Sequence, residues 1–484
     1  MSIGKEIVNG VFWNAIQRYS GIFVQICVTS LLARLLCPED FGVVAIASVF
    51  INFFSLFTDM GIGTAIVQNQ ELSKKDLDFI FSFCIYCGVV LSGLFFCSSR
   101  LIGAAYKNES LIGICNLLSV NLLLASWNIV PNALLYKNKR FKFIAQRTLG
   151  LQVLCGVVSV VAAFCGLGMY ALVISPIVTS IGLFILNYRQ YPLRFTCLID
   201  FQSLKKIGSF SVYQFLFNFI NYFSRNLDKL IVGKSFSMNE LGYYEKSYRL
   251  MMFPLQNITY VITPVMHPVL TALQNDYHEL TDKYSKIIKL IAIVSFPLGV
   301  FLYFAADGLI ALVYGDKWMS VIPVFRILAL SVPLQLILST TGAIYQAAGK
   351  TNLLFFAGLI NSCCTVTGFS IAAMNFHTLQ SIAWAWTITL CINFTVSFTI
   401  LCKKVLHQSL YGMLNQLIFP MVSGVVLAFM LLMFKYEFES AADYVSLISM
   451  TILTGITVLV SGYMICKSEF IWIYKSYKHN VDKK

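Results

Sequence analysis

The chain has 484 residues, of which 58% are hydrophobic and only 12% are charged. Soluble domains carry about 25% charged residues, so this composition excludes an ordinary soluble core and makes lipid the expected solvent for much of the chain. The formal net charge of +13 would suggest a nucleic-acid partner in a soluble protein. Here the basic residues lie mainly in short segments between apolar runs, so we expect no nucleic acid and interpret the charge as an orientation signal.

Fourteen apolar runs follow one another along the sequence, and each is long enough for a transmembrane helix of about 20 residues. The runs do not alternate every second residue, which favours helices over a barrel. We therefore predict an all-α polytopic membrane protein with about fourteen transmembrane helices. The runs cover residues 11–33, 41–67, 78–104, 110–135, 148–168, 170–188, 209–233, 241–271, 287–313, 321–347, 352–374, 379–402, 412–434 and 444–466.

The charges between the runs predict their orientation. With the N-terminus in the cytoplasm, the inner segments hold 23 Lys and Arg residues and the outer segments hold 6. Five of the inner charges fall in residues 137–147, and Arg147 is the last of them. Because Lys and Arg accumulate in cytoplasmic loops, we predict that both termini are cytoplasmic.

A faint internal repeat predicts the organisation of the helices. Residues 33–50 are similar to residues 233–250, with Asp40 opposite Glu240 and Gly42 opposite Gly242. A second similarity pairs residues 134–143 with residues 343–355. Both fall at corresponding places in two sets of six helices, which predicts a parallel repeat about the membrane normal. We predict an N-terminal lobe at 1–190, a cytoplasmic linker at 191–207, a C-terminal lobe at 208–404, and two further helices with a cytoplasmic tail at 405–484.

Metal, cofactor and nucleotide sites are not expected. Cys84 and Cys87 form a CxxC motif inside an apolar run, and no second Cys/His pair lies nearby. We interpret these cysteines as packing residues. The five histidines are scattered, and the chain has no GxxxxGK[ST] motif for a nucleotide.

Five stretches together resemble a known family. They are FWNAIQRYSGIFVQICVTSLLARLLCPEDFGVVAIASVF (12–50), GIGTAIVQ (61–68), IVPNALLYKNKRFKFIAQR (129–147), NYFSRNLDKLIVGKSFSMNELGYYEKSYRL (221–250) and IYQAAGKTN (344–352). The chain resembles the polysaccharide flippases, which are the O-antigen and exopolysaccharide exporters of the multidrug/oligosaccharidyl-lipid/polysaccharide flippase superfamily. The resemblance spans most of the chain.

This resemblance implies a fold and a function. The fold is two six-helix lobes around a central cavity in the inner (plasma) membrane, with two added helices. The function is alternating-access transport of an undecaprenyl-diphosphate-linked oligosaccharide, such as a lipopolysaccharide O-antigen unit, from the cytoplasmic to the outer leaflet. The expected partners are this lipid-linked oligosaccharide, the lipid bilayer and other glycan-assembly proteins.

Charged residues inside apolar runs are the candidate site, because charges in the membrane are costly unless they serve a function. Arginine and lysine make charge-assisted hydrogen bonds with phosphate. We therefore predict that a cationic group binds the substrate diphosphate, and that Asp228 is the candidate for binding a coupling ion. An alternative is that Lys229 and Lys246 snorkel to the membrane surface and that Arg225 and Asp228 form a structural pair. The predicted substrate-binding residues are Arg225, Lys229, Lys246, Arg249 and Arg18.

Two other functions are weighed against the flippase. A multidrug exporter of the same superfamily would have twelve helices and would favour acidic cavity residues for cationic drugs. A membrane glycan polymerase or ligase would need a large outer loop with catalytic groups, whereas the outer loops here are short. We therefore expect a transporter and not an enzyme.

Overall fold

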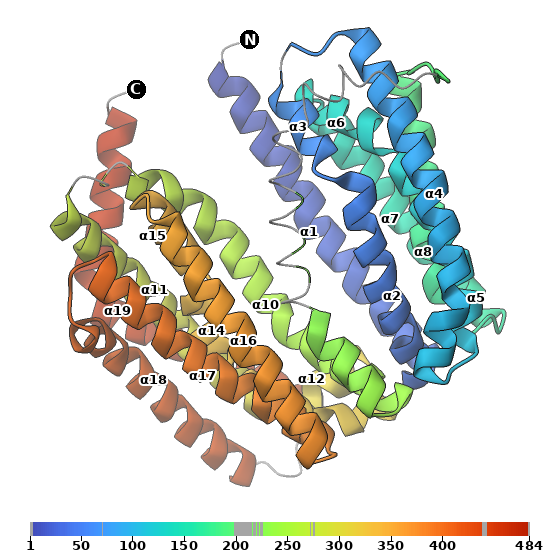
Figure 1. The fold of residues 1–484 in the computed structure, drawn as a ribbon. Coiled ribbons are helices and arrows are strands. Elements are labelled where there is room, and N and C mark those ends of the chain that lie inside the picture. Colours follow the sequence, from blue (N-terminus) through green and yellow to red (C-terminus); the bar gives the residue numbers. More distant parts are fainter. Residues whose placement is uncertain are drawn as a thin grey trace. The chain divides into compact units, whose positions relative to one another are not determined.

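The computed structural model describes residues 3–69, 71–197, 226–271, 276–437 and 443–482, with a few isolated positions between them. In these ranges every regular element is a helix (Figure 1), and residues 226–235 are helical as well. The all-α class is confirmed. The helices are α1 (Ile3–Leu35), α2 (Pro38–Asp59), α3 (Ile62–Gln68), α4 (Lys74–Tyr106), α5 (Ser110–Trp127), α6 (Ile129–Lys137), α7 (Phe141–Phe164), α8 (Tyr170–Gln190), α10 (Met238–Thr271), α11 (Tyr277–Phe304), α12 (Ala306–Val313), the 3₁₀ helix η1 (Asp316–Val321), α13 (Ile322–Ala329), α14 (Val332–Leu338), α15 (Thr341–Ala347), α16 (Thr351–Asn375), α17 (Leu379–Lys404), α18 (Leu410–Glu437) and α19 (Asp443–Asp482).

The chain is a multi-pass membrane protein, but the count of fourteen spans is not confirmed. Among the described residues, 10 helices are long and apolar enough to cross a membrane, or up to 11 if one bent pair is a single span. Most of the predicted run 209–233 lies outside the described residues. Helix α10 has the length to cross but is not among the ten. It carries four charged residues near its beginning, namely Glu240, Glu245, Lys246 and Arg249.

The chain divides into two compact units. The first holds residues up to Glu245 together with Val313–Lys317, and the second holds the rest. In the first unit α1 packs against α7, α4 against α5, and α3 against α6. In the second unit α11 packs against α14, α18 and α19, and α16 runs beside α17 (Figure 1). The predicted division into lobes and linker stays a prediction.

The described part of the predicted linker is docked on the first unit. The backbone N–H of Arg194 donates to the Asp78 carboxylate at 2.8 Å, and that of Thr196 donates to the Ser82 hydroxyl at 2.9 Å. Both acceptors lie on α4. Leu193 is buried in the same region, within a hydrophobic cluster formed by residues of α3, α4 and α6. Residues 191–197 therefore stabilise the beginning of α4 as well as continuing the chain.

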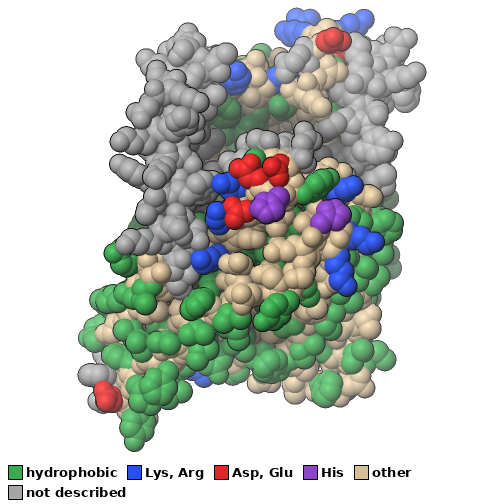
Figure 2. Space-filling view, turned by 90° about the vertical axis from the view of Figure 1, so that its left-hand side faces the viewer, with side chains coloured by type: hydrophobic (Ala, Val, Ile, Leu, Met, Phe, Trp, Pro, Cys, Tyr) green, Lys and Arg blue, Asp and Glu red, His purple; other side chains and the backbone are tan. Residues whose placement is uncertain are grey.

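The surface is suited to lipid. One face of the molecule shows a broad hydrophobic area that is bordered by charged and histidine side chains (Figure 2). Helix α18 alone exposes Ile418, Phe419, Val425 and Phe429, and the exposed fraction of Phe419 is 68%. An exposed apolar surface of this kind would be a liability in water but is expected against acyl chains.

The two sequence similarities correspond to the same local structures. The backbone N–H of Cys37, just before α2, donates to the Asp40 carboxylate at 2.9 Å. Just before α10, the N–H of Ser237 donates to the Glu240 carboxylate at 3.0 Å. Each helix thus begins with the same carboxylate cap, which satisfies a backbone donor that a helix start leaves unpaired.

The second similarity reproduces a helix–loop–helix connection. Residues 138–140 join α6 to α7, and residues 348–350 join α15 to α16. The middle residue of each loop is left-handed: Lys139 has φ 53° and Gly349 has φ 67°. Both loops place this conformation two residues after the helix ends, where it reverses the chain at little cost for glycine.

The beginnings of α2 and α10 are in close contact within the first unit. A Cβ atom built on Gly42 would overlap the carbonyl oxygen of Met238, and one built on Gly242 would overlap the carbonyl oxygen of Pro38. Each glycine therefore packs on the first residue of the other helix. The sequence repeat aligns Gly42 with Gly242, so the two helix starts make the same contact with each other in both directions.

Several spans are interrupted, and proline explains two of the interruptions. Helix α5 ends at Trp127, four residues before Pro131, and α13 ends at Ala329, four residues before Pro333. Proline has no backbone N–H, so Pro131 cannot donate to the carbonyl of Trp127 and Pro333 cannot donate to the carbonyl of Ala329. The span that contains α2 and α3 is interrupted differently, by two consecutive left-handed residues, Met60 and Gly61.

We predict that Gly42→Ala and Gly242→Ala each lower the stability of the folded protein. The added methyl group would force two backbones apart, and overpacking of this kind costs about 1–3 kcal/mol. Gly93→Ala on α4 is the matched control, because a Cβ there meets nothing within 4 Å. Thermal unfolding of the purified variants in detergent measures the effect. Equal melting temperatures for all three variants would contradict the contact.

Candidate functional site

The predicted residue Lys229 forms an ion pair. Arg225, four residues earlier, lies outside the described residues. The Lys229 ammonium lies 2.8 Å from the Glu245 carboxylate of α10, and both side chains are mostly buried. Glu245 therefore compensates part of the cationic charge that we predicted for this region.

Asp228, the predicted ion-coupling residue, lies beside this pair. Its side chain is 4% exposed. The Tyr244 hydroxyl donates a hydrogen bond to one carboxylate oxygen at 3.0 Å. The other oxygen, Oδ1, is buried without a hydrogen-bond partner among the described residues. The structure thus brings together Asp228, Lys229, Tyr244 and Glu245, and the role of Asp228 in ion coupling stays a prediction.

The remaining predicted residues have different surroundings. Lys246 is only 2% exposed, and its ammonium lies 5.6 Å from the centroid of the Trp318 ring in the second unit. This cation–π contact stabilises a charge that burial would otherwise penalise. Arg249 is exposed, and Arg18 on α1 is partly buried. Their binding roles stay predictions.

A separate charge cluster lies in the second unit. The Arg326 guanidinium contacts both oxygens of Asp307, at 2.8 and 2.6 Å, and Lys435 contacts one of them at 2.9 Å. The guanidinium also lies over the Tyr303 ring. The cluster ties α12, α13 and α18 together, so it has the character of a structural anchor.

A polar pocket in the first unit was not predicted from the sequence. It has a volume of about 450 Å³ and lies where α2–α3 and α5–α6 are interrupted. Asp59 and Thr64 line it from the first interruption, and Asn128 and Asn132 line it from the second. Tyr136 lies at its edge and is 44% exposed. Such a volume is within the range of small-molecule sites.

Arg147 stands behind this pocket, and its place corrects our assignment. We counted it among the charges of an inner loop, but it lies two turns inside α7 with only 7% of its surface exposed. Its Nη2 donates to the Asn132 Oδ1 at 2.7 Å. Nε and Nη1 are buried and have no hydrogen-bond partner among the residues that the structure describes. The signal in the sequence was the helical pattern beginning at Phe141, seven residues before the apolar run that we recognised.

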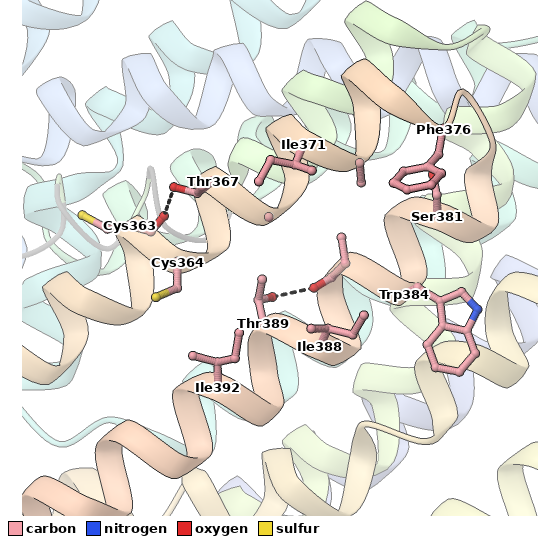
Figure 3. Close-up of a pocket in the computed structure, with 13 residues that line it drawn as sticks. Cys363, Cys364, Thr367, Ile371, Phe376, Ser381, Trp384, Ile388, Thr389 and Ile392 are labelled. Atoms are coloured by element: carbon pink, nitrogen blue, oxygen red, sulfur yellow. Dashed lines mark hydrogen bonds between the residues drawn. The ribbon is translucent and has the colours of Figure 1, made fainter.

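An apolar groove of about 660 Å³ lies between α16 and α17 in the second unit (Figure 3). Its two threonines have no hydroxyl proton left to donate to a ligand, because each donates to a carbonyl of its own helix. Thr367 donates to the Cys363 carbonyl at 2.9 Å, and Thr389 donates to the Ala385 carbonyl at 2.7 Å (Figure 3). The groove therefore suits acyl or prenyl chains and is a poor site for a glycan.

We predict that Lys229 and Glu245 stabilise the fold as a pair. Lys229→Glu should lower the free energy of unfolding by about 2 kcal/mol or more, because it adds a third carboxylate beside Glu245 and Asp228. The double change Lys229→Glu/Glu245→Lys should recover most of that loss in the same thermal unfolding assay. Lys283→Glu is the control, since its partner Glu279 is 3.9 Å away and half-exposed. A double variant no more stable than Lys229→Glu would show that the pair does not matter.

The chain is similar to proteins of glycan assembly. The family described as polysaccharide biosynthesis protein matches residues 31–323. The teichuronic acid biosynthesis protein TuaB of Bacillus subtilis is 25% identical over 400 residues, which cover 82% of each chain. The lipopolysaccharide biosynthesis protein WzxC of Escherichia coli is 24% identical over 417 residues, covering 84% of this chain and 83% of that protein.

A solved structure shares the fold. The lipid II flippase MurJ, in an inward closed conformation, has a TM-score of 0.75 at 14% identity, covering 95% of this chain and 100% of that one. At this identity the likeness concerns the fold alone. The family match covers more than half of the chain, and it agrees with the family that the sequence resembles. This protein therefore belongs to the family of polysaccharide biosynthesis proteins.

Proposed function

We propose that this protein is a flippase, which moves a lipid-linked oligosaccharide from the cytoplasmic to the outer leaflet of the inner membrane. The observation that carries the proposal is a polar pocket inside a membrane-spanning unit of a polysaccharide biosynthesis protein. The named relatives act in teichuronic acid and lipopolysaccharide biosynthesis. The protein acts as a transporter and not as an enzyme.

The physical task explains why polar groups are needed in the membrane. A diphosphate and a chain of sugar hydroxyls must cross about 30 Å of hydrocarbon. An unpaired hydroxyl in an apolar medium costs roughly 2–7 kcal/mol, and an unpaired charge costs far more. A polar path removes most of this cost while the prenyl chain stays in lipid. The apolar groove between α16 and α17 and the exposed apolar face of α18 are compatible with such a division.

The remaining parts of the proposal follow from the sequence. The cargo is carried on undecaprenyl diphosphate, both termini are cytoplasmic, and lobes 1–190 and 208–404 alternate in access around a central path. Other glycan-assembly proteins supply the cargo on the inner side and consume it on the outer side. The diphosphate is held by Arg225, Lys229, Lys246, Arg249 and Arg18.

We predict that Arg225→Ala abolishes glycan export while protein abundance in the membrane stays near normal. Removing the guanidinium removes its two-pronged contact with phosphate, so Arg225→Lys should restore only part of the export. The measurement is surface glycan in cells whose own copy is deleted, with lipid-linked oligosaccharide quantified in the same cells.

The matched control is Arg189→Ala at the exposed end of α8, which should export at the wild-type rate. The deletion strain should accumulate lipid-linked oligosaccharide. Wild-type export by both Arg225→Ala and Arg249→Ala would refute the cationic site. Normal surface glycan in the deletion strain would refute the proposed function.

A further inference from the structure

The polar pocket at the interrupted helices has the hydrogen-bonding groups of a sugar site. An interrupted helix leaves backbone groups without helical partners, and membranes tolerate this only where protein or a polar cavity satisfies them. Two interruptions meet at this one pocket, because α3 packs against α6. The arrangement therefore places polar side chains inside the membrane-spanning unit at a defined position.

Arg147 fixes the direction of one of these side chains. A guanidinium can only donate hydrogen bonds, so the Asn132 atom at 2.7 Å from it must be the amide oxygen. The Asn132 amide nitrogen, with its two donors, therefore points away from Arg147. Asn132 lines the pocket, so these donors are available to a ligand there. Arg147 is a positioning residue in this arrangement.

Asn128 is held in a similar way. Its side-chain amide makes a 2.6 Å hydrogen bond with the side chain of Asn187, which is fully buried on α8. Asn128 lies one helical turn before Asn132, so the two amides line the same side of the pocket. Both are anchored from behind by buried groups, which lowers the entropy that a ligand would have to overcome.

Asp59 supplies the complementary acceptor. Its carboxylate lies at the beginning of α3, where one of its oxygens would be 3.6 Å from a Cβ atom built on Gly63. A carboxylate has about four acceptor positions, and Asp59 lines the pocket, so it can accept hydrogen bonds from a ligand there. The hydroxyl of Thr64 and the phenol of Tyr136 can donate or accept.

The charge of the pocket decides between ligand classes. Asp59 contributes one negative charge and Arg147 one positive charge behind Asn132, so the site is close to neutral. A phosphate would face the Asp59 carboxylate, which disfavours it. A sugar ring presents hydroxyls that both donate and accept, and these match amide donors alternating with a carboxylate acceptor.

We propose that this pocket binds an uncharged sugar unit of the cargo through its hydroxyls. Asp59 accepts from the sugar, Asn132 and Asn128 donate to it, and Arg147 holds Asn132 in place. This rests on the proposed function and names the part of the cargo that the first unit recognises. The diphosphate is bound elsewhere.

Binding of two probes to the purified full-length chain tests the proposal. One probe is a short-chain prenyl diphosphate that carries a hexose, and the other is the same prenyl diphosphate without sugar. The wild-type chain should bind the hexose probe roughly tenfold or more tightly than the sugar-free probe, since hydrogen bonds to a charged group contribute at least that much. Asp59→Asn and Asn132→Leu should each bring this ratio close to one and leave the affinity for the sugar-free probe unchanged.

The matched control is Asn121→Leu. Asn121 lies on α5, the helix just before α6, and is hydrogen bonded to Ser180, but it does not line the pocket. It should keep the wild-type ratio, and so should Thr367→Val in the apolar groove of the second unit. Thr64→Val, the smallest change within the pocket, should lower the ratio without unfolding the protein.

Two outcomes would overturn the sugar site. The first is a wild-type ratio in both Asp59→Asn and Asn132→Leu. The second is tighter binding of the sugar-free probe by Asp59→Asn, which would show that the pocket binds the diphosphate. A wild-type chain that binds neither probe would instead contradict the proposed function itself, so the two failures are distinguishable.

Discussion

A backbone in hydrocarbon must pair its own N–H and C=O groups, and an unpaired group there costs several kcal/mol. Most of this chain meets the requirement with uninterrupted helices such as α4 and α7. Where the chain departs from it, at Met60–Gly61 and before Pro131, a polar pocket lies at the interruptions. The same requirement explains why Asn128, between α5 and α6, and Asn132 on α6 are anchored by buried partners. In the first unit one polar pocket therefore lies where helices stop, whereas the group of Asp228, Lys229, Tyr244 and Glu245 lies within helices.

The sequence predicted much of the fold, because hydropathy and charge act over whole segments. Where the structure describes them, the apolar runs are helical, and the repeat at Gly42 and Gly242 corresponds to two helix starts with the same cap. The direct contact between these two glycines could not be predicted, since it depends on how the helices cross. The interruptions inside four predicted spans were missed as well. The mean hydropathy of a long segment changes little when it contains one proline or one glycine. Pro131 and Pro333 were nevertheless visible in the sequence, and a proline is sufficient to end a helical hydrogen-bond pattern.

The candidate site was predicted less completely, for reasons that particular residues make clear. Lys229 and Glu245 are sixteen positions apart and on different helices, so their pairing is a property of packing. Lys246 was predicted as a cavity cation, but nothing in the sequence connects it with Trp318. Arg147 lies at the edge of an apolar run, where a charge resembles a loop residue until the helix start at Phe141 is known. Asp59 and Asn132 are sixty or more positions apart, and only the contact between α3 and α6 brings their segments to one pocket.

The most direct test of the account is lipid translocation by the purified protein in proteoliposomes. Lipid-linked oligosaccharide with a fluorescent sugar is placed in both leaflets, and a membrane-impermeant quencher reports the fraction that reaches the outside over time. The account predicts that vesicles with the wild-type chain expose the inner pool much faster than protein-free vesicles, and that Arg225→Ala removes this difference. Equal rates with and without the wild-type protein would contradict the claim that this chain moves a lipid-linked glycan.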